Sequence, residues 1–187
     1  MPQDFKVAIQ FYELAARQGH PQAQCNLGVM HQYGRGTARS IKHAFKLYEL
    51  AANQGYSAAQ FNLGLMYRVG GTGVTRNSQK AAFWYRRAAG QGNAQAQCDL
   101  GVMYSSGIGI PEDNRQAVRW YRKAAHAGHT QGQFNLAYMY ATGAGVARND
   151  LFAINWYKAS ADQGHLLAKK NLVIMMRTQV PLDDSDA

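Results

Sequence analysis

Apolar residues recur every three or four positions near the start of the chain, at Val7, Ala8, Phe11, Tyr12 and Ala15. This spacing places them on one stripe of an α-helix that runs from about residue 4 to residue 18. A second helix is predicted from about Pro21 to Tyr33, where Pro21 suits the first turn because its missing N–H needs no partner there. The pattern therefore predicts a pair of helices.

The same pair of helices recurs along the whole chain. A tyrosine, an Ala-Ala pair and a glycine reappear in one register, with successive spacings of 36, 37, 36 and 36 residues. The tyrosines are Tyr12, Tyr48, Tyr85, Tyr121 and Tyr157, and the glycines are Gly19, Gly55, Gly92, Gly128 and Gly164. The one extra residue lies in the loop 70–73, where an insertion costs little. Five copies of one unit therefore fill most of the chain.

Each copy carries matching signals for the start and the end of its first helix. A good N-cap residue precedes each of these helices, at Asp4, Ser40, Asn77, Asp113 and Asn149. The recurring glycine ends each helix, because glycine adopts the left-handed backbone conformation without steric cost. No alternating strand pattern competes with this interpretation. We therefore expect an all-α protein of ten antiparallel helices.

The second helix of each copy carries a leucine and, three residues later, a methionine. These pairs begin with Leu27 and Met30 and end with Leu172 and Met175. A methionine-rich surface can bind partners, but leucine and methionine at this spacing are more often core residues. Gly28, Gly64, Gly101 and Ala137 follow the leucines directly, and small residues there let two helices approach closely.

The motif "AAxQGxxxAQxNLGxMY", followed by "GxGV" and "AxxWYxxAA", resembles the Sel1-like repeat, a relative of the tetratricopeptide repeat. Matching residues are Ala59 to Tyr67, with Ala117, Trp120, Tyr121, Ala124 and Ala125. The resemblance implies a right-handed α/α solenoid of five repeats of about 36 residues, at about 4–39, 40–76, 77–112, 113–148 and 149–178. An acidic tail, 179–187, follows this solenoid of residues 1–178. The family implies a non-enzymatic adaptor that binds a protein or peptide in a concave groove.

The resemblance also implies that the second helix of each repeat lines this groove. The stripe opposite the leucines and methionines on these helices carries the candidate binding residues Asn26, Val29, Tyr33, Asn62, Leu65, Asp99, Val102, Asn135, Tyr138 and Asn171. A row of asparagine side chains can pair with the backbone of an extended peptide, since each amide offers donors and an acceptor. Each asparagine can instead bond the second helix of the neighbouring repeat and hold the stack together. Both alternatives stay open at this point.

The chain has 20 Lys and Arg residues against 11 Asp and Glu residues, a net charge of +9. Twelve of the cations fall on the first helices of the repeats, where tryptophan and tyrosine lie among them, as in Arg119 to Lys123. Cations and aromatic rings together can bind single-stranded nucleic acid. However, adjacent helical residues point about 100° apart, so the rings can be buried while the cations face water. Nucleic acid, or another acidic partner, on the convex face is therefore the alternative to the groove.

Other kinds of chemistry lack a motif in this sequence. The glycine-rich loops follow helices and lack the Gly-Lys-Ser/Thr ending of a phosphate-binding loop. We therefore interpret them as turns. His20, His129 and His165 fall one to a repeat, too far apart to hold one metal ion. Cys25 and Cys98 are two repeats apart, beyond the reach of a disulfide within one chain. We therefore expect no cofactor, no metal and no catalytic site.

The two ends of the chain lead to further expectations. No apolar run is long enough to span a bilayer, and residues 1–12 lack the features of a secretory signal. If Met1 is the native start, we expect a cytoplasmic protein. At the other end, no capping helix follows Leu166, Leu167, Val173, Ile174 and Met176. The tail then folds back, or this end docks onto another copy or a partner, or the chain is a fragment of a longer repeat protein.

Overall fold

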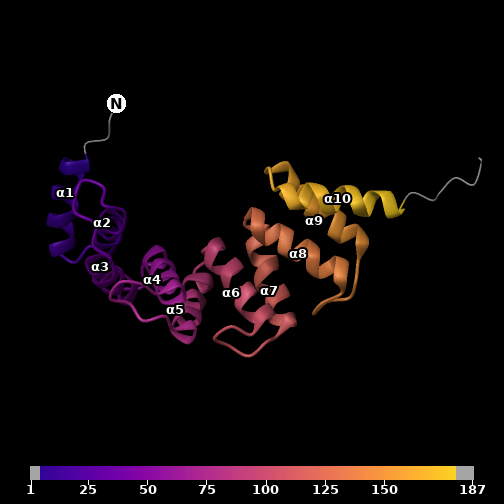
Figure 1. Cartoon of the computed structure of the whole chain (residues 1–187), viewed down its shortest axis with the longest axis horizontal. Helices are drawn as coiled ribbons and strands as arrows, with labels where there is room; N and C mark the ends of the chain where they lie inside the picture. Colours follow the sequence, from indigo (N-terminus) through magenta and orange to yellow (C-terminus); the bar gives the residue numbers. More distant parts are fainter. Residues whose placement is uncertain (1–4, 180–187) are drawn as a thin grey trace, which may run out of the picture. The chain divides into compact units, whose positions relative to one another are not determined.

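The computed structural model describes residues 5–179, and within this range ten α-helices follow one another along the chain (Figure 1). They are α1 (Phe5–Arg17), α2 (Pro21–Tyr33), α3 (Ile41–Asn53), α4 (Ser57–Val69), α5 (Ser78–Gly90), α6 (Ala94–Ser106), α7 (Asn114–His126), α8 (Thr130–Thr142), α9 (Asp150–Asp162) and α10 (Leu166–Gln179). The all-α prediction is confirmed, and the predicted bounds of the second helix, Pro21 to Tyr33, are those of α2. We call α1, α3, α5, α7 and α9 the outer helices and α2, α4, α6, α8 and α10 the inner helices, after the expectation above.

The helices fall into two compact units. Unit 1 holds the chain up to Ala96 together with Ile108–Pro111, and unit 2 holds Gln97–Gly107 and the chain from Glu112 onward. In each unit the helices pack mainly against their neighbours in the sequence. Helix α6 begins in unit 1 and lies mainly in unit 2.

The predicted caps are present at four outer helices. The side chains of Ser40, Asn77, Asp113 and Asn149 each accept a hydrogen bond from the backbone N–H three residues later, at 2.8–3.3 Å. Each of these bonds satisfies a donor that the first turn leaves without a helical partner. The fifth predicted cap, Asp4, lies outside the described residues.

The recurring glycines end the outer helices as predicted. Gly55 has φ +90°, and its N–H donates to the Ala52 carbonyl oxygen while the N–H of Tyr56 donates to that of Ala51. This pair of bonds is the Schellman motif, which satisfies two carbonyls at the end of α3. The chain therefore turns sharply into α4, the inner helix of the same repeat.

The Gly-x-Gly loops that follow the inner helices are turns that contact the outer helices. Gly34 caps α2 with φ +67°, and a Cβ atom placed on Gly36 would stand 2.8 Å from the backbone of Phe5, the first residue of α1. Gly109 and Gly145 lie in the same way against Ser78 and Asn114. Glycine is needed at these positions because the loop backbone rests directly on a helical backbone.

The recurring tyrosines are the centre of the packing between outer and inner helices. The rings of Tyr48, Tyr85 and Tyr121 lie on Gly28, Gly64 and Gly101, where an added Cβ would stand 2.6–2.8 Å from the ring. Tyr157 and Ala137 are both buried in unit 2. The close approach predicted from the small residues is confirmed.

The leucine and methionine ladder also belongs to the core, as predicted. Leu27, Leu63, Leu100 and Leu136 are buried, as are Met30, Met66, Met103 and Met139. Leu172 and Met175 of α10 are only partly buried. Five further apolar side chains of that helix are exposed: Leu166, Leu167, Val173, Ile174 and Met176. Within the part of the chain that the structure describes, this helix therefore has an open apolar surface.

Candidate partner-binding surface

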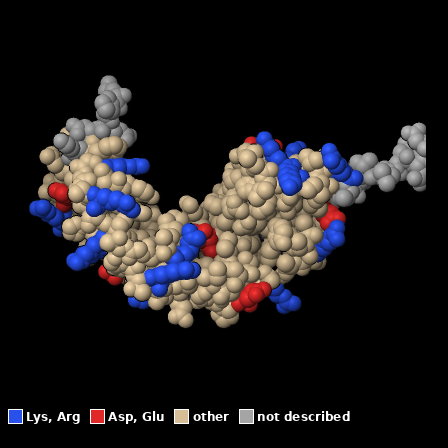
Figure 2. Space-filling model, in the orientation of Figure 1, with Lys and Arg blue, Asp and Glu red and all other residues tan. Residues whose placement is uncertain are grey.

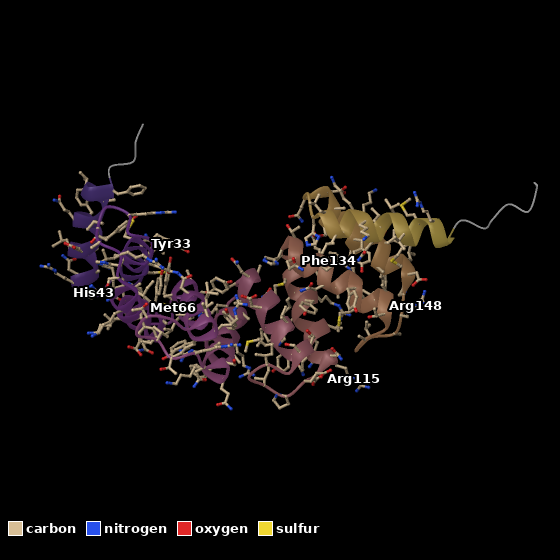
Figure 3. All side chains as sticks on the ribbon, in the orientation of Figure 1. Tyr33, His43, Met66, Arg115, Phe134 and Arg148 are labelled. Atoms are coloured by element: carbon tan, nitrogen blue, oxygen red, sulfur yellow. The ribbon has the colours of Figure 1, made fainter. Side chains whose placement is uncertain are left out.

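The candidate binding residues lie on the side of the inner helices opposite the buried leucines. In unit 1, Asn26, Val29, Asn62 and Leu65 are partly buried, and the Tyr33 side chain, labelled in Figure 3, is 60% exposed at the end of α2. We call this surface of α2 and α4 the unit 1 inner face.

The equivalent surface of α6, α8 and α10 is the unit 2 inner face. Its members Asp99, Asn135 and Asn171 are partly buried, whereas Val102 and Tyr138 are exposed. Val69 in unit 1 and Ile174 in unit 2, which stand 36 residues after Tyr33 and Tyr138, are also exposed. Each unit therefore presents apolar side chains next to a row of amide or carboxyl groups.

Two of the asparagines bond the preceding inner helix. Asn62 Nδ2 donates to Cys25 Sγ and Asn135 Nδ2 donates to Cys98 Sγ, both at 3.7 Å. The contacts are the ones expected if the asparagines hold neighbouring repeats together. Each amide nitrogen carries a second N–H, so this contact does not use the whole amide group.

A polar network continues from Asn135 over the unit 2 inner face. Gln131 Nε2 donates to Asn135 Oδ1 at 2.9 Å, and Gln131 Oε1 lies 3.1 Å from His165 Nε2. The His165 ring stacks on Phe134, labelled in Figure 3, with ring centroids 4.6 Å apart. Gln131 of α8 thus holds the Asn135 oxygen, and His165, which directly precedes α10, holds Gln131.

A cavity of about 400 Å³ opens on unit 2 beside Tyr138. Its lining includes three predicted residues, Asn135, Tyr138 and Asn171, and six that the sequence did not assign to a site: Ser105, Asn114, Tyr121, Phe134, Met139 and Ala144. Tyr121 Oη lies 3.1 Å from Ser105 Oγ at this cavity, and burial raises the pKa of Tyr121 to about 12, so the phenol stays neutral. The cavity is lined by aromatic rings and by neutral hydrogen-bonding groups.

Unit 1 has a smaller cavity of about 300 Å³ on its inner helices. Leu65 is the predicted binding residue that lines it, together with Gln32, Arg39, Ile41, Met66, Val69 and the loop Gly70 to Thr72. Arg39 Nε donates to the Gln32 carbonyl oxygen at 3.2 Å and holds the loop after α2 against this helix.

The two thiols are structural. Cys25 and Cys98 are both buried and free of disulfides. Burial raises the pKa of Cys25 to about 11 and that of Cys98 to about 12, although the asparagine N–H groups oppose this shift. Thiolate nucleophiles need a lowered pKa, so neither cysteine has the environment of a reactive thiol.

Cations are spread over the outer helices, and their aromatic neighbours are partly buried. Figure 2 shows far more Lys and Arg than Asp and Glu side chains on the face in view. Trp84, Trp120 and Trp156 are each partly buried, and Lys123 Nζ lies 4.5 Å from the centre of the Trp120 ring. Stacking of a nucleic-acid base would require an open ring face, which these positions offer only in part.

Neither metal-ligand clusters nor membrane spans occur in residues 5–179. No group of three or more His, Cys, Asp and Glu side chains there comes close enough to hold a metal ion. None of the helices in that range has the length and apolar character that crossing a bilayer requires.

Sequence comparison places five Sel1 repeats along the chain. The Sel1 repeat profile matches residues 1–20, 21–56, 57–93, 94–129 and 130–165, so its unit begins at the inner helix. A comparison with curated protein sequences gives no significant match. Proteins of the Sel1 repeat type generally mediate protein–protein interactions, and they are typically non-enzymatic scaffolds.

Solved structures with the same fold include two bacterial proteins at more than 30% identity. One is a protective antigen present in uropathogenic Escherichia coli that displays an SLR fold, with 39% identity and a TM-score of 0.90 over 95% of this chain. This chain spans 38% of the antigen's length. The other is a Sel1 repeat protein from Oxalobacter formigenes, with 34% identity and a TM-score of 0.88, covering 98% of this chain and 76% of that one.

A third similar structure is the Helicobacter pylori cysteine rich protein B. It has 25% identity and a TM-score of 0.55, over 71% of this chain and 98% of that one. With five profile matches over most of its length, the present chain belongs to the Sel1 repeat family.

Proposed function

We propose that the chain is a non-enzymatic adaptor that binds an extended segment of a partner protein on its inner faces. The observation that carries the proposal is the cavity on unit 2, where the 52% exposed ring of Tyr138 lies beside the amides of Asn135 and Asn171. An exposed aromatic side chain next to hydrogen-bonding groups has the composition of a binding hot spot.

The chemistry of this cavity indicates what kind of segment fits it. A volume of about 400 Å³ accommodates one apolar or aromatic side chain, which would contact Phe134, Tyr138 and Met139. The amides of Asn135 and Asn171 line the same cavity and can pair with the peptide backbone on either side of that side chain. Lys, Arg, Asp and Glu are absent from its lining, so the favoured side chain is neutral.

Unit 1 offers a second, smaller contact area of the same kind. Leu65 and Val69 line its cavity, and Tyr33 is exposed on the same inner face. Each unit is proposed to bind its own part of a partner, and the tests below address unit 2.

The proposal is tested by photo-cross-linking from two matched positions. The photoreactive residue p-benzoylphenylalanine replaces Tyr138 on inner helix α8 or, as a control, the 48% exposed Phe152 on outer helix α9. We expect a discrete cross-linked protein from position 138 in a lysate of the source cells, and none from position 152. Equal cross-linking from both positions, or cross-linking from 152 alone, contradicts the proposal.

The captured partner is then purified and its affinity for the full chain is measured by calorimetry. Tyr138→Ala should weaken binding by about 10-fold or more, as removal of a hot-spot ring does, whereas Phe152→Ala should leave the affinity unchanged. Circular dichroism establishes that both variants remain folded. An equal loss of affinity in the two variants would contradict binding on the inner face.

Nucleic acid bound by the outer helices is the alternative outcome. Exposed Arg86, Arg87, Arg119, Arg122 and Lys123 favour it, but Arg122 donates to Tyr140 Oη at 3.1 Å and is thus partly engaged within unit 2. Affinity for phosphate groups falls by orders of magnitude as salt rises, whereas recognition on a neutral inner face should change little. A complex that is lost at high salt and is insensitive to Tyr138→Ala would therefore identify the outer helices as the binding surface.

A further inference from the structure

The position directly before the recurring tyrosine holds a tryptophan on three of the outer helices. Trp84, Trp120 and Trp156 stand there on α5, α7 and α9, whereas α3 has Leu47 at this position. The three indole rings are partly buried, although the outer helices carry many exposed side chains. The leucine of α3 is therefore a local departure from the pattern of the later outer helices.

In unit 2, the ring of Trp156 fills the space between two outer helices. It stands edge-on to the ring of His126, the last residue of α7, with ring centroids 5.2 Å apart. The same ring packs against the core cluster to which Ala125 and Leu136 belong. One tryptophan of α9 thus closes the space between α7 and α9.

In unit 1, the equivalent space between α1 and α3 is a cavity of about 460 Å³. We call it the α1–α3 cavity, and its lining is Glu13, Ala16, Arg17, Gly19, Gln24, Leu27, Leu47 and Leu50. Leu47 stands where Trp156 stands in unit 2, and Arg17 stands where His126 stands. A described helix lies on either side of the cavity, so the smaller side chain at residue 47 accounts for it.

The size and the apolar walls of the α1–α3 cavity suit a flat hydrophobic molecule. Small-molecule sites typically have volumes of about 300–1,000 Å³, a range that includes this cavity. Its apolar lining comes from three helices: Ala16 of α1, Leu27 of α2, and Leu47 and Leu50 of α3. Leu50 is 53% exposed, so a bound molecule would remove apolar surface from water.

The two charged side chains of the lining favour an indole ring over an aliphatic group. A guanidinium group such as that of Arg17 is attracted to an aromatic face, and Arg87 already lies 5.7 Å from the centre of the Trp84 ring. The carboxylate of Glu13 accepts hydrogen bonds and so suits the N–H of an indole. Within residues 5–179, neither Glu13 nor Arg17 forms an ion pair, so both groups are available to a ligand.

We propose that the α1–α3 cavity binds a small molecule that carries an indole ring, in the place that the Trp156 ring occupies in unit 2. The ring contacts the leucines, its face lies against Arg17, and its N–H donates to Glu13. None of the candidate binding residues of the inner faces lines this cavity. The proposal is therefore independent of the proposed adaptor function.

The test adds indole to the isotope-labelled full chain and follows the backbone amide signals by NMR. A ligand of this size should bind with a Kd of about 0.1–1 mM, so indole is added up to about 5 mM. We expect saturable shifts that are largest at Ala16, Gly19 and Leu47, with one Kd for all three signals.

Leu47→Trp supplies the ring that the later outer helices have and should fill the cavity, so that indole binds at least about 10-fold more weakly. The matched control is Leu151→Trp, the same substitution at a 64% exposed leucine of outer helix α9, which should bind indole as wild type does. Circular dichroism establishes that both variants are folded. Arg17→Met keeps the length of an exposed side chain and removes its charge, and it should weaken binding about 3-fold.

Three results would overturn the proposal. The first is the absence of saturable shifts in wild type over this concentration range, and the second is equal binding of indole by wild type and by folded Leu47→Trp. If Leu47→Trp does not fold, unchanged binding by Arg17→Met takes the place of the second result. The third is binding of N-acetyltryptophanamide without binding of free indole, because the cavity would then belong to a tryptophan side chain of a partner protein.

Discussion

His129 Nδ1 accepts a hydrogen bond from the backbone N–H of Gly132 at 3.1 Å and thereby caps α8. Only the unprotonated nitrogen can accept this bond, so the cap depends on a neutral ring. Burial lowers the pKa of His129 from its ordinary value of 6.5, and the carboxylate of Asp99 opposes this shift. The folded state therefore favours the neutral ring.

This cap should make the stability of unit 2 depend on pH. As the pH falls below 6.5 the unfolded chain takes up a proton first, so the free energy of unfolding decreases until the folded protein is protonated as well. His129→Asn keeps a capping side chain that does not titrate, so its free energy of unfolding should fall less between pH 7 and pH 5. Urea unfolding at several pH values measures how the free energy of unfolding depends on pH in wild type and in the variant. An equal dependence in the two proteins would exclude His129 as a contributor.

Gly101→Ala should destabilise the protein in spite of the better helix propensity of alanine. The new methyl group would stand 2.6 Å from the Tyr121 ring, and such overpacking costs about 1–3 kcal/mol. Gly90→Ala is the matched control, because Gly90 is also helical and a Cβ there meets nothing within 4 Å. It should stabilise by up to about 1 kcal/mol. Thermal unfolding of both variants tests the pair, and a stabilising Gly101→Ala would contradict the tyrosine packing.

Ala127→Gln should stabilise unit 2. Ala127 follows α7 at the position where Gln54, Gln91 and Gln163 follow their helices, with similar backbone angles, and its methyl group cannot donate a hydrogen bond. A glutamine there can reach the buried Gln97 as Gln163 reaches Gln133, for a gain of about 1 kcal/mol. Ala127→Met, which has similar length and no amide, is the control in urea unfolding. Equal stability of the two variants would show that the amide adds nothing.

Cys25 and Cys98 should react slowly with a thiol reagent in the folded protein. Both thiols are buried, and their pKa values are raised to about 11 and about 12, so almost no thiolate forms at pH 8. We expect almost no rapid colour with Ellman's reagent in buffer and two equivalents in denaturant. Rapid reaction in buffer would show that the inner helices open far more often than this packing implies.

Much of the fold was predictable because each repeat carries its own local signals. The caps at Ser40 and Asn77 and the glycine that ends each outer helix depend only on nearby backbone, so the sequence places them correctly. The pairing of small residues with buried tyrosines also follows from the register, since Gly64 recurs as glycine or alanine in the first four copies and Tyr85 recurs in all five.

The details of the candidate site were less predictable because they depend on neighbouring helices. The sequence leaves open whether Asn62 and Asn135 bond a peptide or a neighbouring repeat, and the contact with a cysteine sulfur depends on how far apart the inner helices lie. Tyr121 belongs to an outer helix, yet it lines the cavity beside Tyr138 because Gly101 leaves room for its ring. Gly101 was therefore the feature of the sequence from which the position of Tyr121 at the cavity could have been predicted.

Neighbouring repeats are joined by a tyrosine ring on a small residue and by a hydrogen bond between two glutamines, and this junction has a consequence for how such chains change in length. Each junction uses side chains from two successive repeats, as in the bond from Gln54 to Gln24, which are 30 residues apart. Duplication or loss of one whole repeat therefore recreates the same junction at the new boundary. The binding surface can lengthen or shorten by one repeat at a time, and no existing side chain needs a compensating substitution. The deletion of half a repeat, in contrast, would leave a tyrosine without its glycine.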